Sequence, residues 1–360
     1  MTKFKKHISF PSIEKFSTVV ANVNRRHNFV GLDENGEPIY DPSKPKPVIK
    51  FKGSVKLHGT NAGICYTQNE GVWYQSRENI ITPQSDNAGF AFFAESKKSV
   101  FDEMFAQVID KTNVDPTLNT ISIYGEWCGG NIQKGVGITN LPKSFFIFGV
   151  KITPHNVEKL EKAPSAYWVD YSYLRNPENL IYNINDYETF EIDIDFNAPQ
   201  LVQNQIIDWT IAVENECPVA KAFGFPNTIG EGIVFSYTTE DGERLSFKSK
   251  GEKHAAKSKV HTLKPVDNEK INKCIEVANK VTPEWRLDQM LEKQFNFING
   301  GTMDVKQLGS YLKLVIDDVI KEDMDVLVEA GVEPKDIGKY VSDIAKKYFF
   351  ARQNQEVGLK

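Results

Sequence analysis

The stretch Lys56-Leu57-His58-Gly59-Thr60-Asn61 decides the fold, because it places a short polar loop between two strand-like runs. The runs cover 48–52 and 62–66 and are rich in β-branched, aromatic and other apolar residues. Strands would therefore hold the lysine on both sides, and Gly59 would let the backbone approach a phosphate or a base closely. This pattern predicts a nucleophilic lysine on a tight loop. For the motif alone, an ordinary surface lysine is the alternative.

Strand-like runs continue from this loop through the first two thirds of the chain, with helical patterns between them. A helix is predicted over 88–110, and apolar residues at helical spacing from Ile13 onward predict a short opening helix. Mostly antiparallel strands with interspersed helices indicate an α+β domain. The strand-like runs at 231–238 and 244–250 are joined by Thr239-Glu240-Asp241-Gly242-Glu243, which predicts a hairpin. The predicted strands lie at 119–126, 144–152, 190–195, 231–238 and 244–250.

The sequence changes character near 262–268, where strand patterns give way to helical periodicity. Apolar residues at helical spacing mark one long helix from Val305 to near Gly331, and a second helix that Pro334 opens. We therefore place a domain boundary there and expect a small, all-helical second domain.

Composition narrows the class of protein. The chain has 360 residues, enough for two domains, and its net charge of −5 excludes a histone-like coat of positive charge but permits a local basic groove. The four cysteines form no Cys-x-x-Cys pair, so we expect reduced thiols rather than a zinc site or a disulfide framework. Neither an apolar signal core nor a run of membrane-spanning length is present, and a cytoplasmic location without membrane contact is expected.

Several polar residues at the ends of predicted strands are candidate site residues that would accompany the lysine. Arg77 ends the strand after the loop and offers a fixed fork of donors to a phosphate. Glu126, in Tyr124-Gly125-Glu126-Trp127, follows a strand and would accept a hydrogen bond from a hydroxyl. Glu231 precedes a strand, and a carboxylate that faces phosphates needs a cation between them, which favours an association with Mg²⁺. For both glutamates, a structural turn residue is the alternative.

Two further segments complete the set. Lys248 and Lys250 alternate with apolar residues, so a strand would place both on one face, which is either a solvated edge or the lining of a cleft. Phe148 ends the aromatic run Phe145-Phe146-Ile147-Phe148 and could stack on a base, although a strand aromatic is more commonly part of a core. A lysine nucleophile requires an unprotonated amine, and neighbouring cations favour that form.

These segments, in this order over residues 50–260, resemble the RNA ligase 2 family of ATP-dependent polynucleotide ligases, the phage-type RNA ligases of the covalent nucleotidyltransferase superfamily. The loop matches the family motif Lys-x-His-Gly-x-Asn, and His58 separates it from DNA ligases and capping enzymes, which typically have Asp there. The chain departs from the family at three positions. Gly149 stands where an aspartate is common, Val55 replaces an acidic residue, and Ala62 replaces a frequent Phe.

The resemblance implies an antiparallel-sheet nucleotidyltransferase domain, an ATP-grasp-like ligase adenylation domain, over 1–262. After it we expect a small all-helical domain over 263–360. Because all the motif segments end by about residue 250, this domain is expected to engage RNA, and the alternative is that it only covers an apolar face of the first domain. The implied activity joins RNA 3′-OH and 5′-phosphate ends through lysyl-AMP and adenylated RNA, in RNA repair. ATP would be the cofactor, with AMP carried covalently on Lys56, together with Mg²⁺ or Mn²⁺ at Glu231. The implied catalytic residues are Lys56, His58, Lys248 and Lys250, and Asn61, Arg77, Glu126, Phe148, Glu231, Lys56, Lys248 and Lys250 would contact the nucleotide.

The expected partner is RNA with such ends, either as a nicked duplex or in another form, and the expected state is a monomer in the cytoplasm (of the host, if the chain is phage-encoded). Two alternatives remain: a capping-type guanylyltransferase, and a non-catalytic RNA-end-binding protein. A basic segment that begins in the last predicted strand and continues beyond it would either contact the RNA backbone or form a solvated tail. It contains Lys248, Lys250, Lys253, Lys257 and Lys259, with His254 and His261.

Overall fold

The computed structural model describes residues 5–32, 35–86, 88–155, 165–254 and 263–356. The chain divides into two compact units, each assembled from several segments, and each is described by itself. The first unit comprises Met1–Val19, Ile49–Ile194 and Asn204–Lys264, and the second comprises Val20–Val48, Asp195–Gln203 and Pro265–Lys360.

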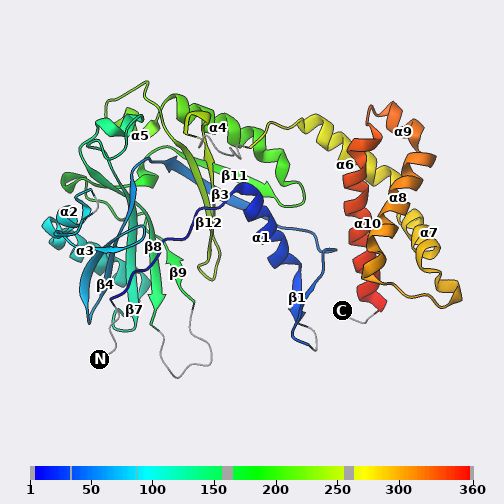
Figure 1. Cartoon of the computed structure of the whole chain (residues 1–360), viewed down its shortest axis with the longest axis horizontal. Coiled ribbons are helices and arrows are strands. Elements are labelled where there is room, and N and C mark those ends of the chain that lie inside the picture. Colours follow the sequence, from blue (N-terminus) through cyan, green and yellow to red (C-terminus); the bar gives the residue numbers. More distant parts are fainter. Residues whose placement is uncertain (1–4, 33–34, 87, 156–164, 255–262, 357–360) are drawn as a thin grey trace. The chain divides into compact units, whose positions relative to one another are not determined.

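Two sheets form the frame of the first unit (Figure 1). The four-stranded sheet has the order β11 (Thr189–Asp195), β3 (Val48–Lys56), β12 (Gly232–Thr238), β13 (Arg244–Lys250). The seven-stranded sheet has the order β10 (Ile181–Asn183), β8 (Ser144–Pro154), β7 (Asn119–Cys128), β4 (Thr60–Thr67), β5 (Gly71–Ser76), β6 (Ile80–Ile81), with β9 (Tyr167–Val169) also paired to β8. In the seven-stranded sheet β10 runs parallel to β8, while the other pairs are antiparallel.

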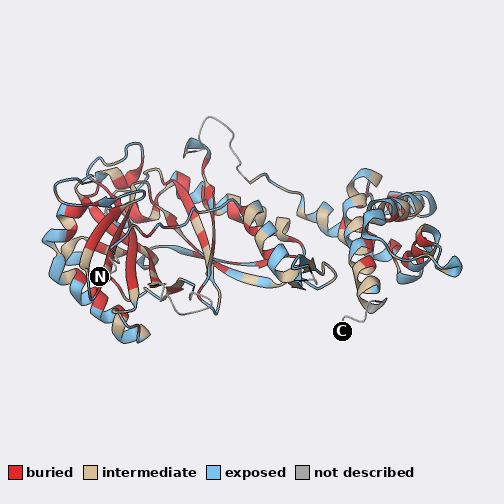
Figure 2. Cartoon of the chain, turned by 60° about the horizontal axis from the view of Figure 1, so that its bottom comes forward, coloured by how far each residue is buried: buried red, intermediate tan, exposed pale blue. Residues whose placement is uncertain are grey.

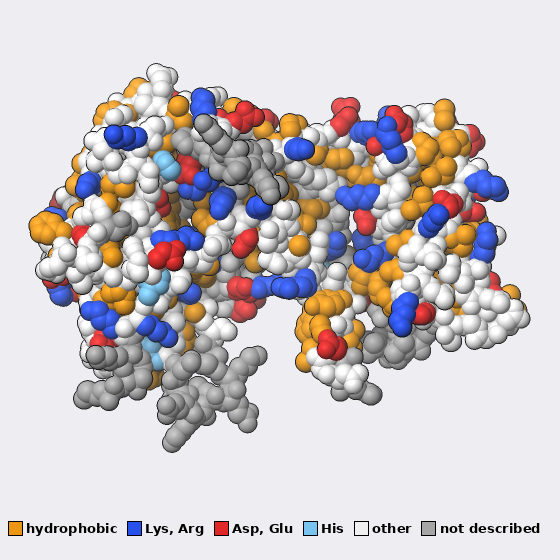
Figure 3. Space-filling view, viewed as in Figure 1, with side chains coloured by type: hydrophobic (Ala, Val, Ile, Leu, Met, Phe, Trp, Pro, Cys, Tyr) orange, Lys and Arg blue, Asp and Glu red, His pale blue; other side chains and the backbone are white. Residues whose placement is uncertain are grey.

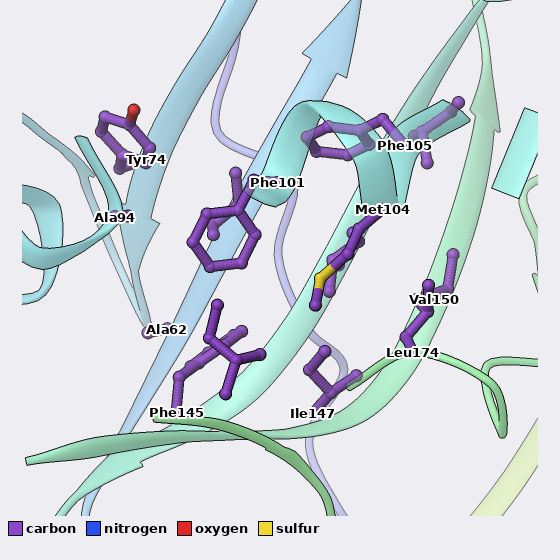
Figure 4. Close-up of a cluster of buried hydrophobic side chains, with 14 of the residues drawn as sticks. Ala62, Tyr74, Ala94, Phe101, Met104, Phe105, Phe145, Ile147, Val150 and Leu174 are labelled. Atoms are coloured by element: carbon purple, nitrogen blue, oxygen red, sulfur yellow. The ribbon is translucent and has the colours of Figure 1, made fainter. Parts of the chain in front are cut away.

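Helices cover the outer face of the seven-stranded sheet. Here α2 (Phe90–Ser96) and α3 (Lys98–Thr112) lie against β4, β7 and β8. The buried side chains of α3 include Phe101, Met104 and Phe105, and they meet Phe145 and Ile147 of the sheet (Figure 4). Figure 2 shows that buried residues concentrate in the strands of this unit. Its other helices are α4 (Gln203–Asn215) and α5 (Pro218–Ala222), and α1 (Phe16–Asn28) begins in it.

The four-stranded sheet has two chemically different faces because its side chains alternate. On one face Phe51, Phe235 and Phe247 are each fully buried, and the rings of Phe235 and Phe247 stack with centroids 5.0 Å apart. Phe16, the first residue of α1, packs on Phe247 at 5.0 Å. The opposite face carries the even-numbered residues of β3, among them Lys56.

The second unit is mainly helical. Its helices are α6 (Asn268–Val281), α7 (Glu284–Phe295), α8 (Leu308–Glu322), α9 (Met324–Glu329) and α10 (Pro334–Glu356), and β1 (Phe29–Leu32) pairs with β2 (Pro38–Tyr40). Inside it, the buried Arg286 forms ion pairs with Asp318 and Asp323. Among the described residues, no helix is long and apolar enough to cross a lipid bilayer.

The predicted fold class is confirmed: antiparallel sheets with helices occupy most of the chain, and a helical region follows. The predicted helix over 88–110 is two helices, because the backbone leaves helical geometry at Lys97, which ends α2 and precedes α3. The opening helix begins at Phe16 rather than Ile13, since the backbone of Glu14 instead pairs with β13. The long helix predicted up to Gly331 is divided into α8 and α9 at Asp323.

The stacked rings of Phe235 and Phe247 predict a position at which shortening a side chain lowers the stability of the first unit. Phe247→Ala should lower the free energy of unfolding by about 3–5 kcal/mol, because it removes a buried ring and leaves a cavity between α1 and the sheet. Urea denaturation followed by circular dichroism measures this loss. Phe92→Ala is the control, since Phe92 on α2 is 68% exposed and should change stability by less than about 0.5 kcal/mol. Equal losses in the two variants would contradict this account.

Candidate active site

The lysine loop connects the two sheets of the first unit. β3 ends at Lys56 and β4 begins at Thr60, so three residues carry the chain from one sheet to the other. A glycine is required at position 59 by close packing, because a Cβ atom there would lie 2.4 Å from the Trp127 carbonyl oxygen. The Gly59 amide donates a hydrogen bond to Glu126 Oε1 at 2.8 Å. The loop is therefore held against the end of β7.

Glu231 is the centre of an ion-pair cluster, and its side chain is only 2% exposed. Lys56 Nζ lies 2.7 Å from Glu231 Oε2, and His58 Nδ1 lies 3.2 Å from the same oxygen. Lys250 Nζ lies 2.6 Å from the other oxygen, Oε1. Burial alone would raise the pKa of Glu231, but the positive charges of Lys56 and Lys250 hold the pKa of this carboxyl below its ordinary value.

The register of β12 explains why these groups meet. Gly232 lies opposite Lys56 on β3 and opposite Lys250 on β13, so the residue just before it stands between the two lysines. Gly232 has a φ of +146°, which favours glycine, and a Cβ atom there would lie 2.1 Å from the Ser249 carbonyl oxygen. The Glu231-Gly232 pair is therefore specified by both charge and backbone geometry.

Glu126 supplies a second carboxyl from the seven-stranded sheet, at the end of β7 and directly opposite Asn61 of β4. Desolvation raises the pKa of Glu126 to about 7, and the nearby Lys56 and the Gly59 hydrogen bond only partly offset this effect. Near neutral pH this carboxyl therefore changes between an acceptor and a donor of hydrogen bonds.

Both sheets line a cavity of about 400 Å³ that opens beside the lysine loop. The structure brings together in its wall seven of the nine sequence-predicted site residues, whereas Glu231 is buried behind Lys56 and Lys250, and His58 reaches the Glu231 carboxylate. The lining comprises Phe10, Ser12, Ile13, Ser54, Val55, Lys56, Leu57, Gly59, Thr60, Asn61, Arg77, Glu126, Phe146, Phe148, Ile184, Val234, Arg244, Ser246, Lys248 and Lys250.

A β-bulge gives Phe148 its place in this wall. In the pairing of β7 with β8, Tyr124 lies opposite Gly149 and Gly125 lies opposite Ile147, so Phe148 is the extra residue. Its half-buried ring packs edge-on against Phe10 at 5.0 Å. An aromatic face is thus available to a flat ligand on the seven-stranded side of the cavity.

Cations also line the cavity: Lys248 and Lys250 on the four-stranded side, and Arg77 just after β5 of the seven-stranded sheet. Lys248 lies on the same face of β13 as Lys250, and desolvation, followed by the positive charges of Lys250, Lys56 and Arg77, lowers the pKa of Lys248. Arg77 is anchored by a hydrogen bond from Nη2 to Ser12 Oγ at 3.3 Å. Cationic groups, a carboxyl and an aromatic ring thus line one cavity, a combination that suits a nucleotide with its phosphates.

Sequence reasoning missed several residues of the wall, most importantly Arg244. Its Nη1 donates to the Phe148 carbonyl oxygen at 3.0 Å and its Nη2 to Ser236 Oγ at 3.2 Å. A Cβ atom at Gly149 would lie 2.8 Å from Arg244 Nη1, so the guanidinium occupies space that a side chain at 149 would need. Strand alternation through Lys248 and Lys250 could have found Arg244, which is an even-numbered residue of the same strand. No comparable sequence pattern could have identified Phe10 and Ser12 as lining residues, because they come from an irregular N-terminal segment.

Two sequence predictions, the metal association of Glu231 and the basic segment, stay predictions. Among the described residues, no group of three or more His, Cys, Asp and Glu side chains is arranged to hold a metal ion, so the metal association of Glu231 stays a prediction. Within the predicted basic segment, the exposed Lys253 donates its amide to Glu214 Oε1 at 2.7 Å. Lys257, Lys259 and His261 lie outside the described residues, and so does the side chain of His254.

Comparison with known protein families shows to which family the chain belongs. The sequence model of the RNA ligase family matches residues 50–250, which run from β3 to the last residue of β13. The chain belongs to the RNA ligase family. The matched part contains the lysine loop, both glutamates and the lysine pair of β13, so the resemblance seen in the sequence is confirmed at the level of the family.

Several solved structures are similar to the chain. A Naegleria gruberi RNA ligase with PPi matches with 17% identity and a TM-score of 0.40 over 70% of this chain and 58% of that chain. A mutant of the Naegleria gruberi ligase with ATP and Mn matches with 16% identity and a TM-score of 0.41, also over 70% and 58%. The chain thus spans less than two thirds of these ligases. The comparison with curated proteins found no match.

The raised pKa of Glu126 predicts a pH-dependent stability. The carboxyl ionises near pH 4.5 in the unfolded chain and near pH 7 in the folded one, so between these values the folded state binds more protons and stability falls as pH rises. Relative to Glu126→Gln, the parent protein should therefore lose up to about 3 kcal/mol from about pH 5 to about pH 8. Urea denaturation of both proteins across this range measures the difference. Parallel stability profiles would show that Glu126 ionises in the folded state as it does in water.

Proposed function

We propose that the chain is an ATP-dependent RNA ligase that joins RNA 3′-OH and 5′-phosphate ends in RNA repair. The observation that carries the proposal is the placement of Lys56 at the wall of the cavity. Its Nζ is 2.7 Å from Glu231, and Lys248, Lys250, Glu126 and a phenylalanine ring line the same space. Membership in the RNA ligase family supports the reaction class.

The proposed reaction has three displacements at phosphorus. In the first, the unprotonated Lys56 Nζ bonds to the α-phosphorus of ATP, and pyrophosphate leaves with the bonding electrons. In the second, an oxygen of the RNA 5′-phosphate bonds to the phosphorus of lysyl-AMP, which returns the amine of Lys56 and leaves adenylated RNA. In the third, the RNA 3′-OH loses its proton as its oxygen bonds to the 5′-phosphorus, and AMP leaves. Each step exchanges one bond to phosphorus for another.

Residue roles in this proposal follow from position and charge. Lys248 and Lys250 would hold phosphates, since β13 places them at the end of the sheet that carries Lys56, and so would Arg77, which lines the same cavity. Glu126 would accept a hydrogen bond from the ribose, and Phe148 would stack on the adenine. Asn61, opposite Glu126, and His58, on the Glu231 carboxylate, would orient the nucleotide and the lysine loop.

The residues present also fit a divalent cation. Two carboxyls, Glu126 and Glu231, interact electrostatically beside the cavity, and oxygen ligands suit Mg²⁺ or Mn²⁺. Glu231 would be the protein ligand of that ion, which when bound neutralises phosphate charge. Because both Glu231 oxygens contact lysines, the ion would have to compete with an ammonium group there.

The division of labour along the chain is part of the proposal. We assign adenylyl transfer to 1–262 and RNA engagement to the helical part, 263–360. All the cavity residues belong to the first unit, which supports this assignment. Lys339, Lys346 and Lys347 lie at helical spacing along α10, where a phosphate backbone could bind them. We further infer a cytoplasmic monomer, in keeping with four buried free cysteines.

Lys56→Ala should abolish covalent labelling of the protein by α-labelled ATP and a divalent cation, because no other group would be placed to attack the α-phosphate. Denaturing gel electrophoresis followed by detection of the label measures the adduct. Lys98→Ala on α3 is the matched control and should label as the parent does, since Lys98 pairs with Asp102 away from the cavity.

The same assay separates the alternatives. Stronger labelling by GTP than by ATP would favour a capping-type guanylyltransferase. A parent protein that binds RNA ends but takes no label from either nucleotide would be a non-catalytic RNA-end-binding protein. Equal labelling of Lys56→Ala and the parent would remove Lys56 from the mechanism.

Replacing Lys339, Lys346 and Lys347 together by alanine should weaken RNA binding while the lysyl-AMP yield stays near that of the parent. The slope of log K against log[salt] should fall by about 0.7 to 0.9 for each phosphate that the variant no longer neutralises. Fluorescence anisotropy with labelled RNA at several salt concentrations measures both quantities. The control replaces Lys280, Lys293 and Lys313, one exposed lysine on each of α6, α7 and α8, and therefore removes the same charge. Equal losses of affinity in the two triple variants would show that only net charge matters.

A further inference from the structure

The cavity of about 400 Å³ beside the lysine loop is the proposed nucleotide cavity. One face of the four-stranded sheet carries basic residues well beyond it. Along β3, Lys50, Lys52, Ser54 and Lys56 share this face, because Phe51, Gly53 and Val55 are buried on the other. On β13, two strands away, Arg244, Ser246, Lys248 and Lys250 share it. The neutral strand β12 lies between these two rows. Lys56 and Lys250 stand at one end of the face, and Lys50, Lys52 and Arg244 stand toward the other.

A second cavity, of about 440 Å³, lies over that other end. It shares two lining residues, Ser54 and Arg244, with the nucleotide cavity, so the two hollows adjoin each other along the sheet. Its lining combines three cations with hydroxyl and amide groups and with the carboxylates of Asp170 and Glu191. The lining comprises Lys50, Lys52, Ser54, Trp168, Val169, Asp170, Tyr171, Ser172, Asn185, Glu191, Ser236, Tyr237, Thr238 and Arg244.

The cations of this second cavity can accept an anionic ligand at small cost. The exposed ammonium group of Lys52 has no ion pair or hydrogen bond within the described ranges. Lys50 has only a 3.8 Å contact with Glu191, in which both side chains are 63% exposed, and such a pair contributes little. The carboxylate of Asp170 already accepts hydrogen bonds from the amide and the hydroxyl of Ser172.

Arg244 is fixed where the two cavities join. Its two donor bonds to Phe148 and Ser236 hold the guanidinium plane, which lies 5.2 Å from the centre of the Trp168 ring. A guanidinium oriented in this way is prepared to bind a phosphate that passes from one cavity to the other. On the face of the molecule visible in Figure 3, basic and acidic side chains are interspersed.

We propose that this second cavity binds the sugar–phosphate backbone of the polynucleotide strand whose end reacts at Lys56. Lys50 and Lys52 lie about 7 Å apart along β3, comparable with the step between successive phosphates of an extended strand. Ser54, Ser236 and Thr238 on the same face offer hydroxyls to sugar and phosphate oxygens. The proposal rests on the proposed function, because it assigns the path by which the substrate of that same site arrives.

Binding of a fluorescein-labelled single-stranded RNA of about 12 nucleotides to the full chain tests the assignment. Lys52→Ala should weaken binding about fivefold at about 0.1 M salt and reduce the slope of log K against log[salt] by about 0.7, as expected when one phosphate is no longer neutralised. Lys52→Arg should restore both quantities. Lys98→Ala on α3 removes the same charge outside both cavities and should bind as the parent does.

Three outcomes would overturn the assignment: unchanged RNA affinity in Lys52→Ala, an equal loss of affinity in Lys98→Ala, or an acidic peptide that binds with the same dependence on Lys52. The lysyl-AMP yield of each protein, measured in parallel, keeps the two proposals distinct. If the parent forms lysyl-AMP but Lys52→Ala binds RNA normally, the RNA path is wrong while the ligase proposal stands. If the parent forms no lysyl-AMP but Lys52→Ala loses affinity as expected, the ligase proposal fails and the polynucleotide site remains.

Discussion

The buried carboxylate of Glu231 is the constraint on which the rest of the site depends. An isolated charge with 2% exposure is costly, and this one is compensated by the ammonium groups of Lys56 and Lys250 at 2.7 and 2.6 Å, with the His58 ring 3.2 Å away. These partners come from the end of β3, the end of β13 and the loop between the sheets. Removing one partner from a buried pair typically costs about 3–5 kcal/mol, so the cluster stabilises the strand register as well as the nucleophile.

The two sheets contribute different chemistry to the cavity. The four-stranded sheet presents lysines and Arg244 on one face and a phenylalanine core on the other. The seven-stranded sheet presents Glu126 and Phe148, and its outer face packs on α2 and α3. The short lysine loop crosses from one sheet to the other and is attached to both, through the Lys56–Glu231 contact and the Gly59–Glu126 hydrogen bond. A cation-rich wall therefore faces an acceptor and a ring across a narrow space.

Because side chains alternate along a strand, much of what the four-stranded sheet contributes to the cavity could be predicted from the sequence. The runs at 231–238 and 244–250 form a hairpin because their turn and their alternation agree, and the shared face of Lys248 and Lys250 followed directly. The glutamate–lysine cluster could not be predicted from spacing, because it depends on β3 and β12 pairing across 175 positions. The break at Lys97 and the packing of Arg244 over Gly149 are likewise tertiary effects, decided by neighbours distant in the chain.

The ion-pair cluster also bears on the order of events in the proposed reaction. While the Lys56 ammonium holds Glu231 Oε2, its nitrogen has no lone pair for attack, so nucleotide binding must change this contact. Phosphates entering the cavity would offer Lys250 a new anionic partner, which would leave Glu231 with its contacts to Lys56 and His58. Glu231 would be the residue to hold a divalent cation, whose charge would replace the one that the carboxylate takes from Lys56. On this reasoning the buried glutamate would link nucleotide binding in the proposed reaction to the freeing of Lys56.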